Sequence, residues 1–183
     1  AKECMNNIFL PTVEAMNKEG RTFKGCLYFG LMLTPKGAKV IEYNCRFGDP
    51  ETQVVLPLLK SDLLEIMQAV EDERLADVNV EFSDGAACCV VVASKGYPQK
   101  YETGFEVTEG KLPENATVFH AGTKLFENRI VTSGGRVLGV TATDENLVKA
   151  VAEAYNAVKF VHFDNEYYRK DIGKKALDKL ADN

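Results

Sequence analysis

The 183-residue chain is long enough for one large domain or two small ones, and its 45% hydrophobic and 27% charged residues are typical of an ordinary globular protein. The net charge of −5 argues against a general nucleic-acid-binding surface. No apolar run approaches the length of a membrane span and no signal peptide is visible, so we expect neither a nucleic-acid nor a membrane partner.

The five cysteines include no Cys-x-x-Cys pair, and Cys88 and Cys89 are adjacent within an apolar run. This pattern argues against a zinc site or a disulfide framework. It predicts buried free thiols in a reducing cytoplasm. The first residues have helical character and no initiator Met, which predicts a fragment or a processed chain.

The N-terminal third predicts a helix followed by a hairpin. Apolar residues at helical spacing over residues 5–16 predict an amphipathic helix that ends near Gly20. Residues 25–33 are almost wholly apolar and predict a buried strand, and residues 38–44 predict a second strand. The turn at residues 34–37, with its Pro and Gly, joins the two strands into an antiparallel hairpin.

The end of the second strand carries the sharpest chemical signal. Side chains alternate along a strand, so Glu42 and Asn44 share one face, and Arg46 joins them if the chain stays extended. Ile41 and Tyr43 would point the other way, toward a core. A carboxylate beside an amide oxygen suits Mg²⁺, and an arginine just beyond suits an anion. Such a pair also occurs by chance in many strands, so the spacing alone leaves metal binding open.

Asp49-Pro50-Glu51 predicts a helix start, with Asp49 as the cap and Pro50 in the first turn. Asp49 therefore has two open interpretations, a structural cap or a substrate contact. Pro57 is expected to kink or end this helix. Ser61-Asp62 predicts the start of another helix.

From residue 78 the pattern changes to strands. Residues 86–93 predict a buried strand, and residues 117–126, 129–133 and 136–143 predict three successive antiparallel strands. Gly134-Gly135 would form the hairpin turn between the last two.

The C-terminal part predicts two helices. The first would be capped by Thr143 or Asp144 and bury an apolar stripe over residues 147–158. A short strand at residues 160–163 and a basic helix at residues 171–180 would follow. The chain is therefore expected to be α+β with predominantly antiparallel pairing and a boundary near residues 75–85.

Other candidate sites are less specific. Arg169 and Lys170, just before a helix start, are a candidate phosphate site, against the alternative of a solvated helix end. The segment Ser133–Arg136 is either a phosphate-contacting loop or a hairpin turn, with the turn favoured. His120 suits a hydrogen-bonded strand histidine. We find no Ser-His-Asp or Cys-His arrangement and no Gly-rich nucleotide loop.

These motifs together resemble one enzyme family. The segments Gly25–Met32 and Glu42–Gln53 closely resemble phosphoribosylamine–glycine ligases, which are ATP-grasp enzymes of purine biosynthesis. The resemblance continues, in order, through residues 94–98, 120–123, 133–138 and 168–173, and so covers essentially the whole chain. The Glu42–Gln53 motif is highly specific.

The resemblance implies a domain organisation and a reaction. Residues 1–80 would be the C-terminal part of the ATP-grasp domain, an antiparallel sheet with helices. Residues 81–183 would be the family's small, strand-rich C-terminal domain with packed helices. The implied ligase joins glycine to 5-phosphoribosylamine as ATP becomes ADP and phosphate. Family chains are more than twice as long and supply most ATP contacts from their earlier part, so no activity is expected of this chain alone.

The resemblance also implies roles for single residues. Glu42 and Asn44 would hold Mg²⁺ or Mn²⁺ against the ATP phosphates, and Arg46 would stabilise the transferring phosphoryl group. Asp49 would orient the glycine ammonium or only cap the helix. By analogy with related enzymes, Arg169 and Lys170 would contact the substrate 5-phosphate. The competing hypotheses are a non-catalytic binding module that retains the ATP-grasp tail, and a carboxylase-type ATP-grasp ligase.

Overall fold

The computed structural model describes residues 1–182, and its contacts divide the chain into two compact units. Unit 1 comprises Ala1–Asp49 and Ser61–Glu81. Unit 2 comprises Pro50–Lys60 and the chain from Phe82 onward. The expected division into domains at residues 1–80 and 81–183 stays a prediction. Within the described residues no helix is long and apolar enough to cross a membrane.

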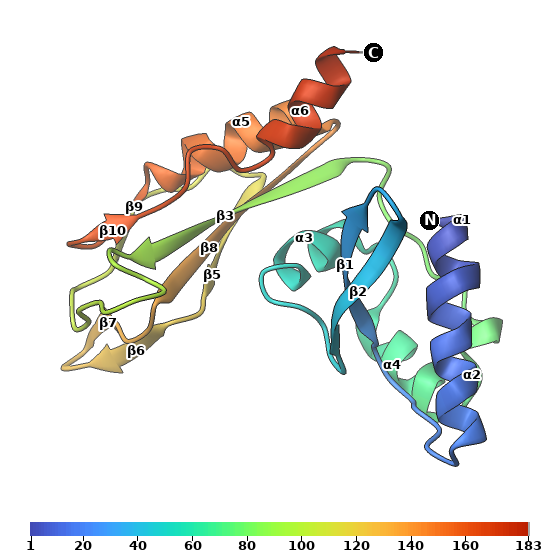
Figure 1. Cartoon of the computed structure of the whole chain (residues 1–183). Helices are drawn as coiled ribbons and strands as arrows, with labels where there is room; N and C mark the ends of the chain where they lie inside the picture. The colour runs from blue at the N-terminus through green and yellow to red at the C-terminus, as the bar shows by residue number, and fades with distance from the viewer. Residues whose placement is uncertain (183) are drawn as a thin grey trace. The chain divides into compact units, whose positions relative to one another are not determined.

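Unit 1 begins with one continuous helix, followed by a hairpin (Figure 1). The helix comprises α1 (Lys2–Cys4), a π-helical stretch (Met5–Phe9) and α2 (Leu10–Lys18). It ends before Gly20, which has a positive φ of 70°, as expected of a helix C-terminus. The rings of Phe9 and Phe29, with centroids 4.4 Å apart, attach the helix to the hairpin.

The hairpin consists of β1 (Tyr28–Thr34) and β2 (Gly37–Asn44), paired antiparallel. The predicted hairpin is therefore confirmed, but its predicted burial is wrong. Leu33 is 79% exposed and Ile41 is 62% exposed. Two causes explain this: the described sheet has only two strands, and a β-bulge interrupts the alternation. Gly30 pairs with Glu42 and Leu31 with Val40, which leaves Ile41 without a partner.

The rest of unit 1 is α4 (Leu63–Glu71) and the 3₁₀ turn Leu75–Asp77. The predicted helix start is confirmed, because Asp62 Oδ1 accepts from the Leu64 N–H at 2.8 Å. Lys24 Nζ lies 2.7 Å from Glu73 Oε1 and links the segment before β1 to the turn after α4.

Unit 2 is organised around a four-stranded antiparallel sheet in the order β10-β3-β8-β5. The two central strands are β3 (Ala86–Ser94) and β8 (Arg136–Asp144), and the outer two are β5 (Ala116–His120) and β10 (Glu166–Tyr167). Helix α5 (Leu147–Val158) packs on β3 and β8 (Figure 1). The core between them is almost entirely aliphatic, with Phe163 as its largest buried side chain. This apolar area removed from water is the main stabilising contribution in the unit.

Shorter elements complete unit 2. Strands β6 (Thr123–Phe126) and β7 (Arg129–Thr132) form a hairpin. Strands β4 (Thr108–Glu109) and β9 (Val161–His162) pair with each other. Helix α3 (Thr52–Val55) and the 3₁₀ turn Leu56–Leu58, where Pro57 ends the helix as predicted, also contact β3. The last helix is α6 (Lys174–Ala181).

The predicted hairpin turn at Gly134-Gly135 is wrong. Strand β7 pairs with β6, whereas β8 pairs with β3 and β5. The expected strand at residues 117–126 is interrupted between β5 and β6, where a Cβ atom on Gly122 would lie 2.8 Å from the Gly134 Cα atom. The tight hairpin turn is instead at Glu127 and Asn128, whose φ values of 47° and 62° suit a two-residue turn between strands.

Three predicted helix starts are also displaced. Helix α3 begins at Thr52, and the residue in its N-cap position, Glu51, makes no capping hydrogen bond. Helix α5 is capped by Asn146 rather than by residues 143 or 144, because β8 continues through Asp144. Helix α6 begins at Lys174, after Gly173 with φ 82°.

Candidate functional site

The predicted metal pair is in contact at the end of β2. Asn44 Nδ2 donates to Glu42 Oε1 at 3.2 Å, which confirms that the two side chains share a face of the hairpin. Glu42 is exposed and Asn44 is half-buried, so the pair lies at the surface of the hairpin. Mg²⁺ typically takes one or two carboxylates and fills its other positions with water and phosphate oxygens. The donor set of this pair therefore fits such an ion.

Gly30 lies opposite Glu42 on the neighbouring strand. The two residues are cross-strand partners, and a Cβ atom on Gly30 would come within 2.8 Å of Glu42 Cγ. A separation this short would force the glutamate side chain to move. The absence of a side chain at residue 30 therefore leaves room for the Glu42 side chain in its present position. Sequence reasoning placed Gly30 in an apolar strand and missed this role, because the bulge that fixes the register carries no clear local signal.

Arg46 does not continue the face of Glu42 and Asn44. Strand β2 ends at Asn44, and the chain bends through residues 45 and 46. Arg46 Nη1 donates to the Phe47 carbonyl at 3.0 Å, and the side chain is exposed. Asp49 lies exposed in the turn before α3. The roles of Arg46 and Asp49 remain predictions.

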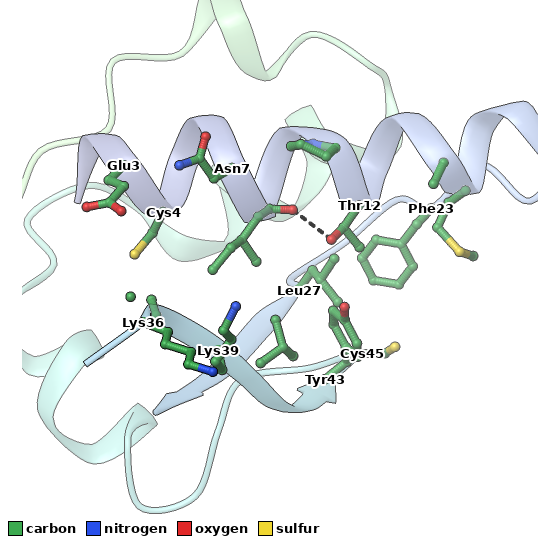
Figure 2. Close-up of a pocket in the computed structure, with 17 residues that line it drawn as sticks. Glu3, Cys4, Asn7, Thr12, Phe23, Leu27, Lys36, Lys39, Tyr43 and Cys45 are labelled. Atoms are coloured by element: carbon green, nitrogen blue, oxygen red, sulfur yellow. Dashed lines mark hydrogen bonds between the residues drawn. The ribbon is translucent and has the colours of Figure 1, made fainter. Parts of the chain in front are cut away.

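A cavity in unit 1 is separate from these residues. It has a volume of about 790 Å³ and lies between the N-terminal helix and β2 (Figure 2). Apolar side chains such as Ile8, Phe23 and Tyr43 line most of it, with Lys36 and Lys39 at one end. None of the predicted site residues is among its lining residues. Because Tyr43 lines the cavity and side chains alternate along β2, Glu42 and Asn44 face the other side of the hairpin.

The second predicted site lies in unit 2, before α6. Arg169 Nε and Nη2 donate to the two oxygens of Asp171 at 2.9 and 2.8 Å. This ion pair raises the pKa of Arg169 and lowers the pKa of Asp171. Lys170 is exposed and makes no ion pair within the described part of the chain. The structure thus brings two basic side chains to one exposed segment.

Two further motifs have structural partners. His120 Nε2 lies 2.8 Å from Glu109 Oε1, and its Nδ1 lies 3.1 Å from Thr123 Oγ1. Both ring nitrogens are thus engaged, which fits the expected hydrogen-bonded strand histidine. Ser94 holds the loop before β8, because its N–H donates to the Gly135 carbonyl at 2.8 Å and its Oγ to the Gly134 carbonyl at 3.0 Å.

The expectation of buried thiols holds for only part of the set. Cys88 and Cys89 are buried in β3, and burial raises the pKa of Cys88 to about 11. Cys45 is exposed beside the predicted metal pair, because β2 has already ended there. Within the described residues no cluster of three or more His, Cys, Asp or Glu side chains has the arrangement of a metal site.

Comparison with known proteins identifies the family of this chain. The model of the phosphoribosylglycinamide synthetase ATP-grasp (A) domain matches residues 1–52, and that of the phosphoribosylglycinamide synthetase C domain matches residues 87–175. The phosphoribosylamine–glycine ligase of Caldanaerobacter subterraneus is 48% identical over 170 residues, which are 93% of this chain and 41% of that protein. The trifunctional purine biosynthetic protein adenosine-3 of Gallus gallus is 51% identical over 173 residues, which cover 93% of this chain and 17% of that protein.

Solved structures agree with the sequence relatives. The phosphoribosylamine–glycine ligase of Thermotoga maritima matches with a TM-score of 0.79 at 35% identity, over 94% of this chain and 43% of that one. The biotin carboxylase domain of a Hydrogenobacter thermophilus carboxylase, solved with MgADP and bicarbonate, matches with a TM-score of 0.56 at 14% identity, over 87% of this chain and 38% of that one. The second likeness, at 14% identity, shows a shared fold alone. This chain spans less than half the length of the ligases that it matches. The chain belongs to the phosphoribosylglycinamide synthetase family.

Proposed function

We propose that this chain is the C-terminal part of a phosphoribosylamine–glycine ligase. The observation that carries the proposal is the order of the two family domains along one chain, with Glu42 and Asn44 in contact at the end of the first. We call the longer polypeptide that would contain this chain the complete ligase. The relatives are more than twice as long, so we propose that turnover needs the complete ligase.

The proposed reaction has two steps. A carboxylate oxygen of glycine attacks the terminal phosphorus of ATP, and the bond from that phosphorus to its bridging oxygen breaks to release ADP. The amine of 5-phosphoribosylamine then attacks the carbonyl carbon of the acyl phosphate. The carbon–oxygen bond to phosphate breaks, the nitrogen loses a proton, and glycinamide ribonucleotide and phosphate result. Both steps depend on positioning and charge stabilisation rather than on a protein nucleophile.

The chemistry of each predicted site residue suits a different role in this reaction. Glu42 and Asn44 supply oxygen ligands for Mg²⁺ or Mn²⁺, which when bound would neutralise charge on the ATP phosphates. Arg46 is exposed just beyond them and would donate hydrogen bonds to the transferring phosphoryl group. Asp49 would orient the glycine ammonium. Arg169 and Lys170 would contact the 5-phosphate of phosphoribosylamine.

The test is phosphate release by the complete ligase with ATP, glycine and 5-phosphoribosylamine. We expect Glu42→Gln to lower kcat about 100-fold or more, because it removes the ligand charge and keeps the shape. The control is Lys39→Gln, which removes a charge from the same strand away from the predicted site and should leave kcat within about twofold. Near-normal turnover of Glu42→Gln would overturn the metal assignment. Turnover that requires bicarbonate would favour a carboxylase-type enzyme.

A further inference from the structure

The segment that carries Arg169 and Lys170 is fastened to α5 by one hydroxyl group. Tyr155 Oη donates to the Arg169 carbonyl at 2.7 Å and accepts from the Ile172 N–H at 3.0 Å. The single hydroxyl therefore bridges two backbone groups on either side of Lys170. Because its only proton goes to the Arg169 carbonyl, the direction of both hydrogen bonds is fixed.

Packing holds the same segment at both ends. Tyr168 and Ile172 pack against the aliphatic core, and the rings of Tyr155 and Tyr168 have centroids 6.3 Å apart. At the far end a Cβ atom on Gly173 would lie 2.8 Å from Val151 Cγ2, so the backbone runs directly over α5. Helix α5 itself is buried along one face. The segment thus rests on a buried and closely packed part of the unit.

The charged side chains of Arg169 and Lys170 lie on the exposed side of this segment. The Arg169 side chain is 68% exposed, and Asp171 holds its guanidinium in one orientation through two hydrogen bonds. Lys170 is exposed beside it. A pre-oriented guanidinium loses less side-chain entropy when it binds an anion than a mobile one does. The backbone beneath these side chains is the part that Tyr155 fixes.

We propose that Tyr155 is the positioning residue for substrate phosphate, holding Arg169 and Lys170 where they meet the 5-phosphate of phosphoribosylamine. The inference rests on the proposed function and adds to it a residue that makes no contact with substrate. Its hydroxyl acts only through the backbone at Arg169 and Ile172.

Tyr155→Phe in the complete ligase tests the inference, because it removes the hydroxyl and keeps the ring in the core. The loss of two hydrogen bonds predicts a roughly three- to tenfold rise in KM for 5-phosphoribosylamine. The values of kcat and of KM for ATP and glycine should stay within about twofold. The inhibition constant of ribose 5-phosphate, which carries the same phosphate, should rise in parallel. In this chain the Ile172 N–H should exchange with solvent faster.

The matched control is Tyr168→Phe, which deletes the hydroxyl group from the neighbouring ring. It should leave kcat and the KM values for 5-phosphoribosylamine, ATP and glycine within about twofold. Equal effects of Tyr155→Phe on every substrate would indicate general structural damage and overturn the inference. The variants Arg169→Ala and Lys170→Ala distinguish a failure of the Tyr155 inference from a failure of the proposed function. If these two raise KM for 5-phosphoribosylamine and Tyr155→Phe does not, the inference alone is wrong. If none of the three variants raises KM for 5-phosphoribosylamine, the phosphate assignment of the proposed function is wrong as well.

Discussion

Gly30 makes room for the side chain of Glu42. The two residues face each other across the β1–β2 hairpin, and a Cβ atom on Gly30 would lie 2.8 Å from Cγ, 3.6 Å from Cδ and 3.5 Å from Oε1 of the glutamate. The β-bulge directly after this pair sets the register that brings the two residues opposite each other. The position of the proposed metal ligand therefore depends on the neighbouring strand as well as on its own.

Gly30→Ala should weaken metal activation of the complete ligase. The added methyl group would displace the Glu42 side chain, and we expect the Mg²⁺ concentration for half-maximal activity to rise about tenfold, in the range found when the support of a metal ligand is lost. Because alanine suits a strand interior better than glycine, the variant should unfold at no lower denaturant concentration. Activation curves with Mg²⁺ and Mn²⁺ measure the effect. Leu33→Ala, at a side chain 79% exposed on the same strand, is the control. Unchanged activation curves would contradict the positioning role of Gly30.

The exposed thiol of Cys45 should react far faster than the buried pair in β3. Cys88 and Cys89 are 5% and 8% exposed, and the thiolate, the reactive form, is strongly disfavoured at Cys88. We expect Cys45 to account for the fast phase of labelling by a disulfide reagent at pH 8. Cys45→Ser should remove that phase and leave the slow phase unchanged. A fast phase that persists in Cys45→Ser would show that another thiol is accessible.

The raised pKa of Cys88 predicts a loss of stability in alkaline solution. The folded state keeps this proton up to about pH 11, whereas the unfolded chain releases it above the ordinary value of 9.0. The unfolded state therefore binds fewer protons between these values, so this contribution to the free energy of unfolding falls as pH rises through the window. Urea unfolding of the chain and of Cys88→Ala between pH 8.5 and 10.5 measures the difference, and the variant should show the shallower decline. Parallel curves would contradict the assignment of the pKa shift.

Asn146 should stabilise α5 through its side chain. Its Oδ1 accepts from the Lys149 N–H at 3.0 Å, which satisfies one of the free donors at the helix N-terminus. Asn146→Ala should lower the free energy of unfolding by about 1 kcal/mol, as measured by urea titration. Asn146→Ser keeps a capping oxygen and should cost much less. Equal losses in the two variants would show that the cap contributes little.

Local patterns were enough to predict several elements of the chain. The N-terminal helix, the hairpin ending at Asn44 and the cap at Asp62 follow from apolar spacing and turn residues within a few positions. The shared face of Glu42 and Asn44 follows from strand alternation, because the two positions lie after the bulge. These features depend on neighbours in sequence, so one sequence was sufficient.

Contacts between distant segments were not predictable in the same way. Strand β8 has its partners in β3 and β5, many residues away, so the adjacent Gly134-Gly135 gave the wrong pairing. The burial expected for residues 25–33 assumed a wider sheet than the two described strands provide. Tyr155 was assigned to the buried stripe of α5, and no sequence signal indicated that its hydroxyl reaches Arg169 and Ile172. Side-chain roles across such distances require the three-dimensional structure.

Gly135 and Tyr97 form a second close approach. The Tyr97 ring lies against the Gly135 backbone, and a Cβ atom on Gly135 would overlap the ring. Gly135→Ala should therefore lower the free energy of unfolding by about 1–3 kcal/mol, the usual cost of overpacking. In a Tyr97→Ala background the ring is gone, and the same substitution should cost less than half as much. Urea unfolding of the four proteins gives the coupling energy as a double-mutant cycle.

Ser133→Ala, two residues away at an exposed position, provides the baseline for this loop and should change stability by less than about 0.5 kcal/mol. A loss for Gly135→Ala that is the same with and without the tyrosine ring would place the strain in the backbone instead. Coupling between the two sites would show that the ring of Tyr97 fixes the path of the loop into β8. Because Ser94 also binds the carbonyl groups of Gly134 and Gly135, the loop would then be held from two sides.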